Sequence, residues 1–290
     1  MRESGALAST LTSTNTAIVL DSTAGLASPS KRHSNWRFIP LYLRLGDETF
    51  LDVVEIGPEE FFRRIRMSGG QPRSSQPSPG DFAAVYESLS GYERIVSLHI
   101  SEKLSGTCQS ARIAAADHGG RVTVVDSGTV SAGIVLLAEA LQDRLEVGTS
   151  DEEIGCVAER HRRDGRFVYT LETLEYLIRG GRVGRAAGLA SQLLDTKPVI
   201  EIREGENAPV KRVRGRAKAL AELEHLFDAS TSDQRPARAA IVHADALADA
   251  ERVAEGVLGL TPGLSVELFE FSPVIATNTG PGAVGLAWIQ

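Results

Sequence analysis

The chain has 290 residues, of which 42% are hydrophobic, and it is about twice as long as the roughly 150-residue unit typical of one domain. Its formal charge of -7 and pI near 5.5 argue against a nucleic-acid-binding protein that relies on a basic surface. Its two cysteines, Cys108 and Cys156, show no CxxC spacing, which indicates neither a disulfide framework nor a zinc site. We expect both to be small buried side chains, and we expect no metal and no cofactor.

The N-terminal segment, residues 1–16, is small and polar and has no hydrophobic period. It predicts a disordered arm that adds nothing to the core, so that the fold begins at Ala17. The segment contains an acidic residue and lacks a long apolar region, and the chain has no run of about 18 apolar residues. These features predict a cytoplasmic protein.

The first half of the chain alternates between strand-like and helix-like patterns. The strands are expected at 17–20, 36–45, 93–100 and 121–126, and the helices at 58–67, 80–89, 105–118 and 130–145. Such alternation is typical of a mostly parallel sheet with crossover helices. We therefore predict an α/β fold in which residues 17–155 form an N-terminal α/β domain with a Rossmann-like sheet.

The second half repeats the alternation. Strands are expected at 167–170, 198–202, 237–244 and 264–271, and helices at 151–163, 173–179, 186–195, 216–228 and 246–258. Residues 156–290 are therefore predicted to form a C-terminal α/β domain. Because no proline-rich linker separates the halves, we expect the two domains to pack firmly and to share a cleft.

Two strand ends resemble each other. The segments IVLDSTAGL (18–26) and TVVDSGTVSAGI (123–134) both lead an apolar strand into Asp-Ser. The side chains of Asp21, Ser22, Asp126 and Ser127 could cap a turn or a helix start. They could equally belong to a ligand site, because ligands of doubly wound sheets bind beyond the carboxyl ends of the strands.

Two hydroxyl-rich turns precede predicted helices. SSQPSPGDF (74–82) places Ser74, Ser75 and Ser78 in a loop stiffened by prolines. HISEKLSGTCQSA (99–111) places Ser105 in a turn between a strand and a helix. Such a turn points N–H groups and hydroxyls at one spot, which suits a carboxylate or phosphate oxygen.

Ser105 could alternatively be a nucleophile. The G-x-S-x-G elbow is absent, and a serine needs an adjacent base before it attacks a substrate. His99 is close in sequence but lies on a predicted strand, and His243 could come from a distant strand. A serine-dependent lipid hydrolase or acyltransferase therefore stays open as an alternative.

The segment LEYLIRGGRVGRAAGLAS (174–191) follows a helical pattern up to Gly180-Gly181. Because its glycines leave a helix rather than a strand, a dinucleotide-binding fingerprint is not indicated. Arg182 could offer its guanidinium to a carboxylate, or it could be a solvated arginine at a helix end. Arginine is dense from Arg160 to Arg185, and this stretch could dock an acidic partner.

The last segment, SPVIATNTGPGAVGLAWIQ (272–290), predicts a tight turn at NTGPGA followed by a terminal strand. Together with DSTAGL, SSQPSPGDF, ISEKLSGTCQSA, VVDSGTVSAG and LEYLIRGGRVGRAAGLAS followed by KPVI, it resembles the DegV family of bacterial fatty-acid-binding proteins. The motifs occur in the family's order over residues 17–290. The resemblance implies two α/β domains that enclose one long-chain fatty acid.

The resemblance also implies a site for the fatty-acid carboxylate. The matching residues are Ser74 in the Ser-Gln-Pro loop, Ser105 of Leu-Ser-Gly, Arg182 of Gly-Gly-Arg, and Asn278. The chain departs from the family pattern at two of them, with Ser74 where the family has threonine and Asn278 where it has histidine. The serine keeps the hydroxyl, whereas the asparagine loses a group that could carry positive charge.

The resemblance implies a binding function without catalysis. Family members present the carboxylate to a separate fatty-acid kinase, whose acyl-phosphate product feeds phospholipid synthesis. We therefore expect a fatty acid and a kinase as partners, together with transient membrane contact. A lipid sensor without any kinase is a further alternative.

Overall fold

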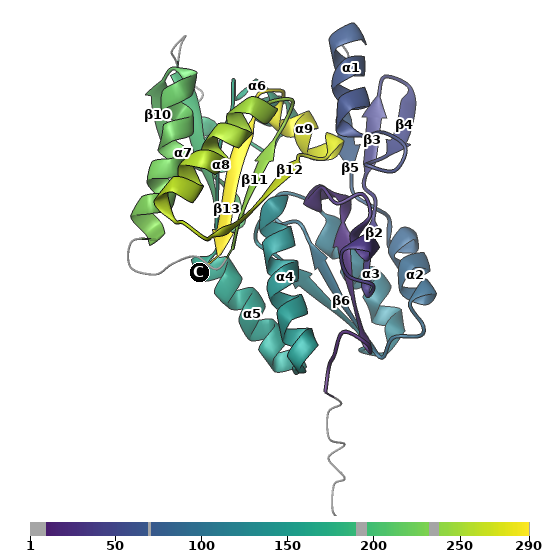
Figure 1. Ribbon diagram of the computed structural model, residues 1–290. Coiled ribbons are helices and arrows are strands. Elements are labelled where there is room, and N and C mark those ends of the chain that lie inside the picture. The colour runs from purple at the N-terminus through teal and green to yellow at the C-terminus, as the bar shows by residue number, and fades with distance from the viewer. Residues whose placement is uncertain (1–9, 69–70, 190–195, 232–237, 290) are drawn as a thin grey trace, which may run out of the picture.

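The computed structural model describes residues 10–68, 71–189, 196–231 and 238–289. The chain forms two α/β lobes that lie against each other (Figure 1). Five layers follow one another: the helix pair α2 and α3, a four-stranded sheet, helix α4, a six-stranded sheet, and the helix pair α7 and α8. The expected α/β fold class is confirmed.

The sheet of the first lobe is parallel throughout, in the order β2-β1-β6-β7. Its strands are β1 (Thr16–Asp21), β2 (Trp36–Ile39), β6 (Arg94–His99) and β7 (Val122–Asp126). Helices α2 (Pro79–Ser88) and α3 (Thr107–Ala115) cover one face, where Phe82 and Tyr86 pack against Ala17 and Val19. The buried runs of these strands are typical of a parallel sheet with helices on both faces.

The strand expected at 36–45 is divided at Pro40. Only β2 joins the parallel sheet, because proline has no backbone N–H to continue the ladder. The next strand, β3 (Tyr42–Leu45), forms a separate antiparallel sheet with β4 (Glu48–Leu51) and β5 (Arg73–Ser75). Helix α1 (Pro58–Ser68) connects β4 to β5. This small sheet places Ser74 beside Leu43, at the edge of the first lobe.

The sheet of the second lobe is mixed, in the order β10-β9-β8-β13-β11-β12, and β11 and β12 are its parallel pair. Its strands are β8 (Arg166–Thr170), β9 (Thr196–Arg203), β10 (Glu206–Arg214), β11 (Arg238–His243), β12 (Ser265–Glu270) and β13 (Val284–Ile289). Helices α7 (Arg216–Thr231) and α8 (Leu247–Leu260) cover its outer face, where Phe227 packs edge-on against Trp288.

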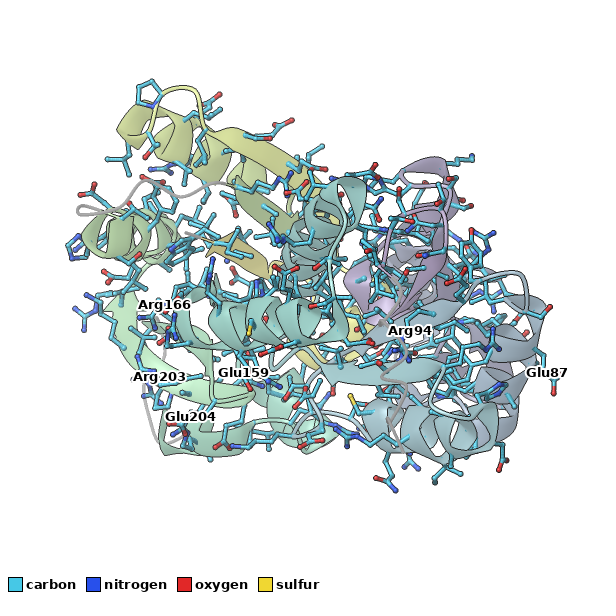
Figure 2. All side chains as sticks on the ribbon, turned by 90° about the horizontal axis from the view of Figure 1, so that it is seen from below. Glu87, Arg94, Glu159, Arg166, Arg203 and Glu204 are labelled. Carbon is cyan, nitrogen blue, oxygen red and sulfur yellow. The ribbon has the colours of Figure 1, made fainter. Side chains whose placement is uncertain are left out.

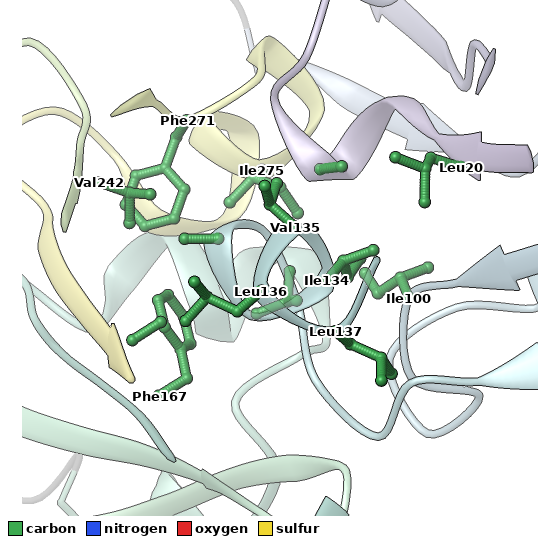
Figure 3. Close-up of a cluster of buried hydrophobic side chains, with 14 of the residues drawn as sticks. Leu20, Ile100, Ile134, Val135, Leu136, Leu137, Phe167, Val242, Phe271 and Ile275 are labelled. Atoms are coloured by element: carbon green, nitrogen blue, oxygen red, sulfur yellow. The ribbon is translucent and has the colours of Figure 1, made fainter. Parts of the chain in front are cut away.

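Helix α4 (Ala132–Val147) lies between the two sheets. Its residues from Ala132 to Glu139 are all buried, which is typical of a helix covered on every side, whereas Asp143, Glu146 and Val147 near its end are exposed. Figure 3 shows Ile134, Val135 and Leu136 between side chains of the first lobe and the ring of Phe167 in the second. Both lobes therefore share one hydrophobic core. Helix α5 (Asp151–Asp164) then leads into the second lobe, and the expected boundary at 155/156 falls within it, so that this division stays a prediction.

Three sequence expectations need correction. Residues 1–9 lie outside the described part of the chain, but Leu11 is buried and exchanges two backbone hydrogen bonds with Thr149, so this part of the arm does contribute to the core. Cys108 is buried as expected, whereas Cys156 is exposed on α5. The expected helix at 186–195 is in its described part a 3-10 turn, Gly184–Leu189, and residues 190–195 lie outside the described residues.

Candidate functional site

An apolar cavity, here called the inner cavity, lies between the lobes. Its empty volume, part of which is open to solvent, is about 680 Å³. Residues of both lobes line it, and the apolar ones include Leu41, Ile100, Val130, Phe167, Phe271 and Ile275. Ser74, Ser105, Arg182 and Asn278 line it as well, so the structure brings the four residues singled out by the motifs to one cavity.

The two serines reach the cavity from different elements. Ser74 lies on β5 and Ser105 in the turn before α3. The backbone N–H of Ser105 donates to the carbonyl of Ser101 at 3.1 Å, so the turn is closed by its own hydrogen bond. The Oγ of Ser105 lies 2.9 Å from the Oγ1 of Thr107, and either atom can be the donor. Each serine is half-buried and can donate a hydroxyl hydrogen to a ligand.

Arg182 follows the short helix α6 (Glu175–Gly180), which ends at Gly181 in the left-handed conformation. Its guanidinium donates to two backbone carbonyls, that of Leu104 at 3.3 Å and that of Gly180 at 2.6 Å. Among the residues that the structure describes, no carboxylate forms an ion pair with it. The charge of Arg182 is therefore positioned by backbone and available to an anion.

Asn278 lies on α9 (Pro273–Thr279), a helix that the sequence analysis did not predict. Its Nδ2 donates to the carbonyl of Val274 at 3.1 Å, one turn earlier in the helix. Its Oδ1 lies against α6, where a Cβ on Gly180 would come within 2.1 Å of it. A glycine at 180 is therefore what allows α6 and α9 to meet beside the cavity.

A second depression, here called the outer pocket, has an empty volume of about 1240 Å³ and shares Ser74, Arg182 and Asn278 with the inner cavity. Arg73 and Arg179 also line it, so its chemistry is polar and cationic. Three of the four predicted residues thus lie where an apolar cavity meets a polar pocket. We call this place the mouth.

Several polar lining residues were not singled out from the sequence. Tyr169 donates its hydroxyl to the Oδ1 of Asn207 at 2.6 Å, and Asn207 donates from Nδ2 to the carbonyl of Arg182 at 2.6 Å. This chain of hydrogen bonds ties the second-lobe sheet to the loop that carries Arg182. Thr23 and Gln76 also line the cavity, and both lie within motifs that the sequence analysis quoted.

The two Asp-Ser junctions serve mainly as structural caps. Asp21 accepts from the backbone N–H of Thr23 at 3.0 Å and of Ile100 at 2.8 Å. Asp126 accepts from the N–H of Gly128 at 2.9 Å. Ser22 donates to the carboxylate of Asp52 at 2.6 Å. These bonds hold the loops at the carboxyl ends of the strands.

The two histidines that could act as a base for Ser105, His99 and His243, do not line the inner cavity. His99 is fully buried, with Nδ1 3.2 Å from Asp21 and Nε2 2.6 Å from the Oγ of Ser97. This Asp-His-Ser sequence of contacts resembles a catalytic triad, but all three side chains are inaccessible, and none of them lines the inner cavity. His243 is also buried and does not line the cavity. Burial raises the pKa of Cys108 to about 12, so its thiol is unreactive.

A third depression, here called the basic pocket, has an empty volume of about 970 Å³. It is lined by Arg162, Arg163, Arg166, Arg203 and Glu204 among others, and Figure 2 shows Arg166, Arg203 and Glu204 near one another. Arg166 and Arg203 both bind Glu201, at 2.7 and 2.5 Å. Part of the arginine-rich stretch therefore forms this pocket.

The second part of that stretch lies close by. Arg185 donates to the backbone carbonyl of Arg203 at 2.9 Å. Contacts between neighbouring arginines thus connect the basic pocket to the loop that carries Arg182. Among the described residues, no helix is long and apolar enough to cross a membrane, and no group of histidine, cysteine or acidic side chains could hold a metal ion.

Comparison with known proteins places the chain in a family. A family model described as "Uncharacterised protein, DegV family" matches residues 15–290. A DegV domain-containing protein from Deinococcus radiodurans is 34% identical over 272 residues, which cover 93% of this chain and 97% of that protein.

Solved structures agree. A DegV family protein from Thermus thermophilus, described as binding fatty acid, has a TM-score of 0.88 and 36% identity, with 95% of this chain and 99% of that chain covered. DegV from Bacillus subtilis, described as a fatty acid binding protein, has a TM-score of 0.85 and 28% identity over 95% of this chain and 99% of that chain. The chain therefore belongs to the DegV family.

Proposed function

We propose that the chain binds one long-chain fatty acid, with its acyl chain in the inner cavity and its carboxylate at the mouth. The supporting observation is that Ser74, Arg182 and Asn278 lie where the apolar cavity meets the polar outer pocket. Burial contributes about 0.8 kcal/mol per methylene, so a long chain gains on the order of 10 kcal/mol before ordering costs. The fatty-acid binding described for the relatives from Thermus thermophilus and Bacillus subtilis supports the same proposal.

The carboxylate needs partners at the mouth, because an unpaired buried charge costs several kcal/mol. In this proposal Arg182 supplies the positive charge, Ser74 and Ser105 donate hydroxyl hydrogens, and Asn278 donates from its amide. Arg182 suits this role because its hydrogen bonds go to backbone carbonyls and leave its charge unpaired among the described residues.

We further propose that the bound carboxylate is presented to a separate fatty-acid kinase and that this chain performs no chemistry of its own. The outer pocket would admit the phosphate donor, and Arg73, which has no ion pair among the described residues, would face it there. The basic pocket and Arg185 would form part of the surface that the kinase contacts. Transient membrane contact during loading would use exposed apolar side chains near the outer pocket, Met67 on α1 and Ile178 on α6.

The hydrolase alternative is less well supported. Ser105 contacts Thr107 rather than a histidine, and both candidate bases lie outside the inner cavity. A general base must reach its nucleophile at about 2.6–3.2 Å, directly or through one water. A lipid sensor without a kinase differs from the proposal only in its partner, and the kinase experiment below separates the two.

Native mass spectrometry of protein purified from bacteria tests the binding proposal. We expect an added mass in the fatty-acid range on the wild type, reloading of one equivalent of palmitic acid after delipidation, and lower occupancy in Arg182→Ala. Arg252→Ala on the far helix α8 serves as the control. Steady turnover of an acyl ester that disappears in Ser105→Ala would favour the hydrolase, and a delipidated protein that takes up no fatty acid would contradict binding.

The kinase proposal is tested by incubating palmitate-loaded protein with a bacterial fatty-acid kinase and ATP, with acyl phosphate as the readout. We expect product formation that weakens as salt is raised, because docking on a basic surface is screened. The double variant Arg162→Glu/Arg163→Glu should lower the rate, whereas Arg252→Glu should not. Absence of product with loaded wild-type protein would favour a sensor.

A further inference from the structure

A wall one residue thick separates the inner cavity from the basic pocket. Phe167 and Ile202 line both spaces, although each side chain is buried. On the cavity side they stand among apolar residues, and on the other side among arginines. The space behind the wall, about 970 Å³ of empty volume, is partly open to solvent.

Neighbouring residues of the wall alternate between the two spaces. Arg166 lines the basic pocket and precedes Phe167, while Arg203 lines it and follows Ile202. In the loop after β7, Thr129 lines the basic pocket and Val130 the inner cavity. Such alternation is what strands and extended segments produce, because successive side chains point to opposite sides. The pairing of Val168 with Glu201 also places Phe167 beside Ile202 on the adjacent strand.

Phe167 lies on the side of the cavity away from the mouth. Tyr169, two residues later on the same face of β8, connects through Asn207 to the loop that carries Arg182. Two residues of a strand span about 6.6 Å, so Phe167 lies deeper along β8 by roughly that distance. Its ring stacks on Tyr169 at 5.8 Å between centroids and meets the edge of Phe271 at 6.5 Å. A Cβ on Gly285 would come within 3.0 Å of it, so a glycine at 285 is what leaves room for the ring.

We propose that Phe167, together with Ile202, sets the maximum length of the acyl chain that this protein accepts. This inference rests on the proposed function and adds its specificity. An acyl chain that enters at the mouth meets the fixed ring of Phe167, and further methylenes have no room on the cavity side. Behind the wall, Arg162 has no ion pair among the described residues and would bind a second carboxylate. The intact apolar wall keeps the charged far end of such a chain from reaching it.

Competition binding with a ladder of saturated acids, from palmitic through stearic and arachidic to behenic acid, tests the length limit. Removing the ring in Phe167→Ala joins the two spaces, and we expect the affinity for behenic acid relative to palmitic acid to rise at least tenfold. Phe227→Ala is the matched control, because Phe227 is an equally buried ring in the second lobe that lines neither the inner cavity nor the basic pocket. It should leave the order of affinities unchanged.

Docosanedioic acid, which has a carboxyl group at each end, provides a second probe. In Phe167→Ala it should bind at least as well as behenic acid, and adding Arg162→Ala should remove that gain. The wild type should reject it. A folded Phe167→Ala protein that keeps the wild-type order of affinities would overturn the inference. A wild type that binds no acid of the ladder would instead contradict the proposed function itself.

Phe167→Ala removes a large buried side chain, so thermal unfolding is measured alongside binding. If that variant does not fold, Phe167→Leu and Ile202→Ala open the same wall by smaller steps. Each should then favour the longer acids over palmitic acid. Unchanged orders of affinity in both folded variants would equally overturn the inference.

Discussion

The hydroxyl of Ser105 would bind the carboxylate in the proposed function and would be the nucleophile in the hydrolase alternative. We expect Ser105→Ala to weaken palmitic acid binding by roughly ten- to a hundredfold, because losing one hydrogen bond to a charged group costs about 1.5–3 kcal/mol. Isothermal titration calorimetry of the delipidated protein measures this change. Ser90→Ala, at an exposed position, is the control. An unchanged affinity would show that the hydroxyl does not contact the carboxylate.

Asn278 is the residue where the chain departs most from the family pattern. In Asn278→His we expect affinity for palmitic acid to be higher at pH 5.5 than at pH 7.5, because an ordinary histidine is protonated below about 6.5 and its charge attracts the carboxylate. The wild type should change less over that range. Titrations at several pH values check this, and parallel profiles of the two proteins would remove Asn278 from the carboxylate site.

The polar residues of the inner cavity and the outer pocket differ in how far the sequence reveals them. Ser74, Ser105, Arg182 and Asn278 lie in short motifs with a recognisable order, and the structure brings all four to one cavity. Asn207 carries no such signal, because its importance comes from the pairing of β9 with β10, which places it beside Arg182. Arg73 also lies outside any recognisable motif, and it is the pairing of β5 with β3 that places it at the outer pocket.

At the level of elements, the sequence predicted mainly apolar strands better than polar ones. Strands β1, β6 and β7 are rich in Ile, Val and Leu, so their type follows from their composition. Strand β10 is largely polar and contains Pro209, which fits an edge position but gives a weak pattern. Helix α9 has seven residues, too few to show a helical period.

Helix α9 is held at its start by Asp52. The carboxylate accepts from the N–H of Val274 at 3.1 Å and from Ser22 at 2.6 Å, and it is fully buried. Burial raises the pKa of Asp52 from its ordinary value of 3.8 to about 7. The folded protein therefore binds a proton more tightly than the unfolded chain does. The protonated carboxyl of Asp52 therefore adds to the free energy of unfolding. This contribution is fully present below about pH 4 and is lost as the pH rises to about 7.

We expect Asp52→Asn to flatten this pH dependence, because the amide cannot ionise. Relative to the variant, the wild type should lose at most roughly 4 kcal/mol of unfolding free energy between pH 4 and pH 7. Urea denaturation at several pH values measures the difference. Asp47→Asn, at an exposed position in the same small sheet, is the control. A constant difference between wild type and Asp52→Asn across the range would show that Asp52 is ionised throughout.

For the whole molecule, α4 predicts one cooperative unfolding transition. The two tryptophans of the chain report separately, since Trp36 lies in the first-lobe sheet and Trp288 in the second-lobe sheet. Trp36→Phe and Trp288→Phe each keep one tryptophan. Within each variant, the urea midpoint measured by the fluorescence of that tryptophan should equal the midpoint measured by circular dichroism. The reason is that both lobes bury their apolar surface against the same helix.

Two separated midpoints within one variant would contradict this prediction. They would show that one lobe keeps its structure after the other unfolds, and that the core shared through α4 does not couple them. Trp36 donates to Gln142 of α4 at 2.9 Å, so Trp36→Phe should lower the common midpoint without dividing the transition. The test therefore compares the fluorescence midpoint with the circular-dichroism midpoint of the same variant.

The close approach of Gly180 to Asn278 also affects how a ligand would enter and leave through the mouth. Because α6 and α9 meet there through a glycine, the side chain of Asn278 rests directly on the backbone of α6. In the proposed function, we expect the entry and departure of an acyl chain to need a shift of α9 as a unit, away from its anchor at Asp52. Such collective shifts take microseconds to milliseconds, much slower than the rotation of an exposed side chain. The residence time of the ligand should accordingly follow the mobility of this short helix more closely than it follows affinity.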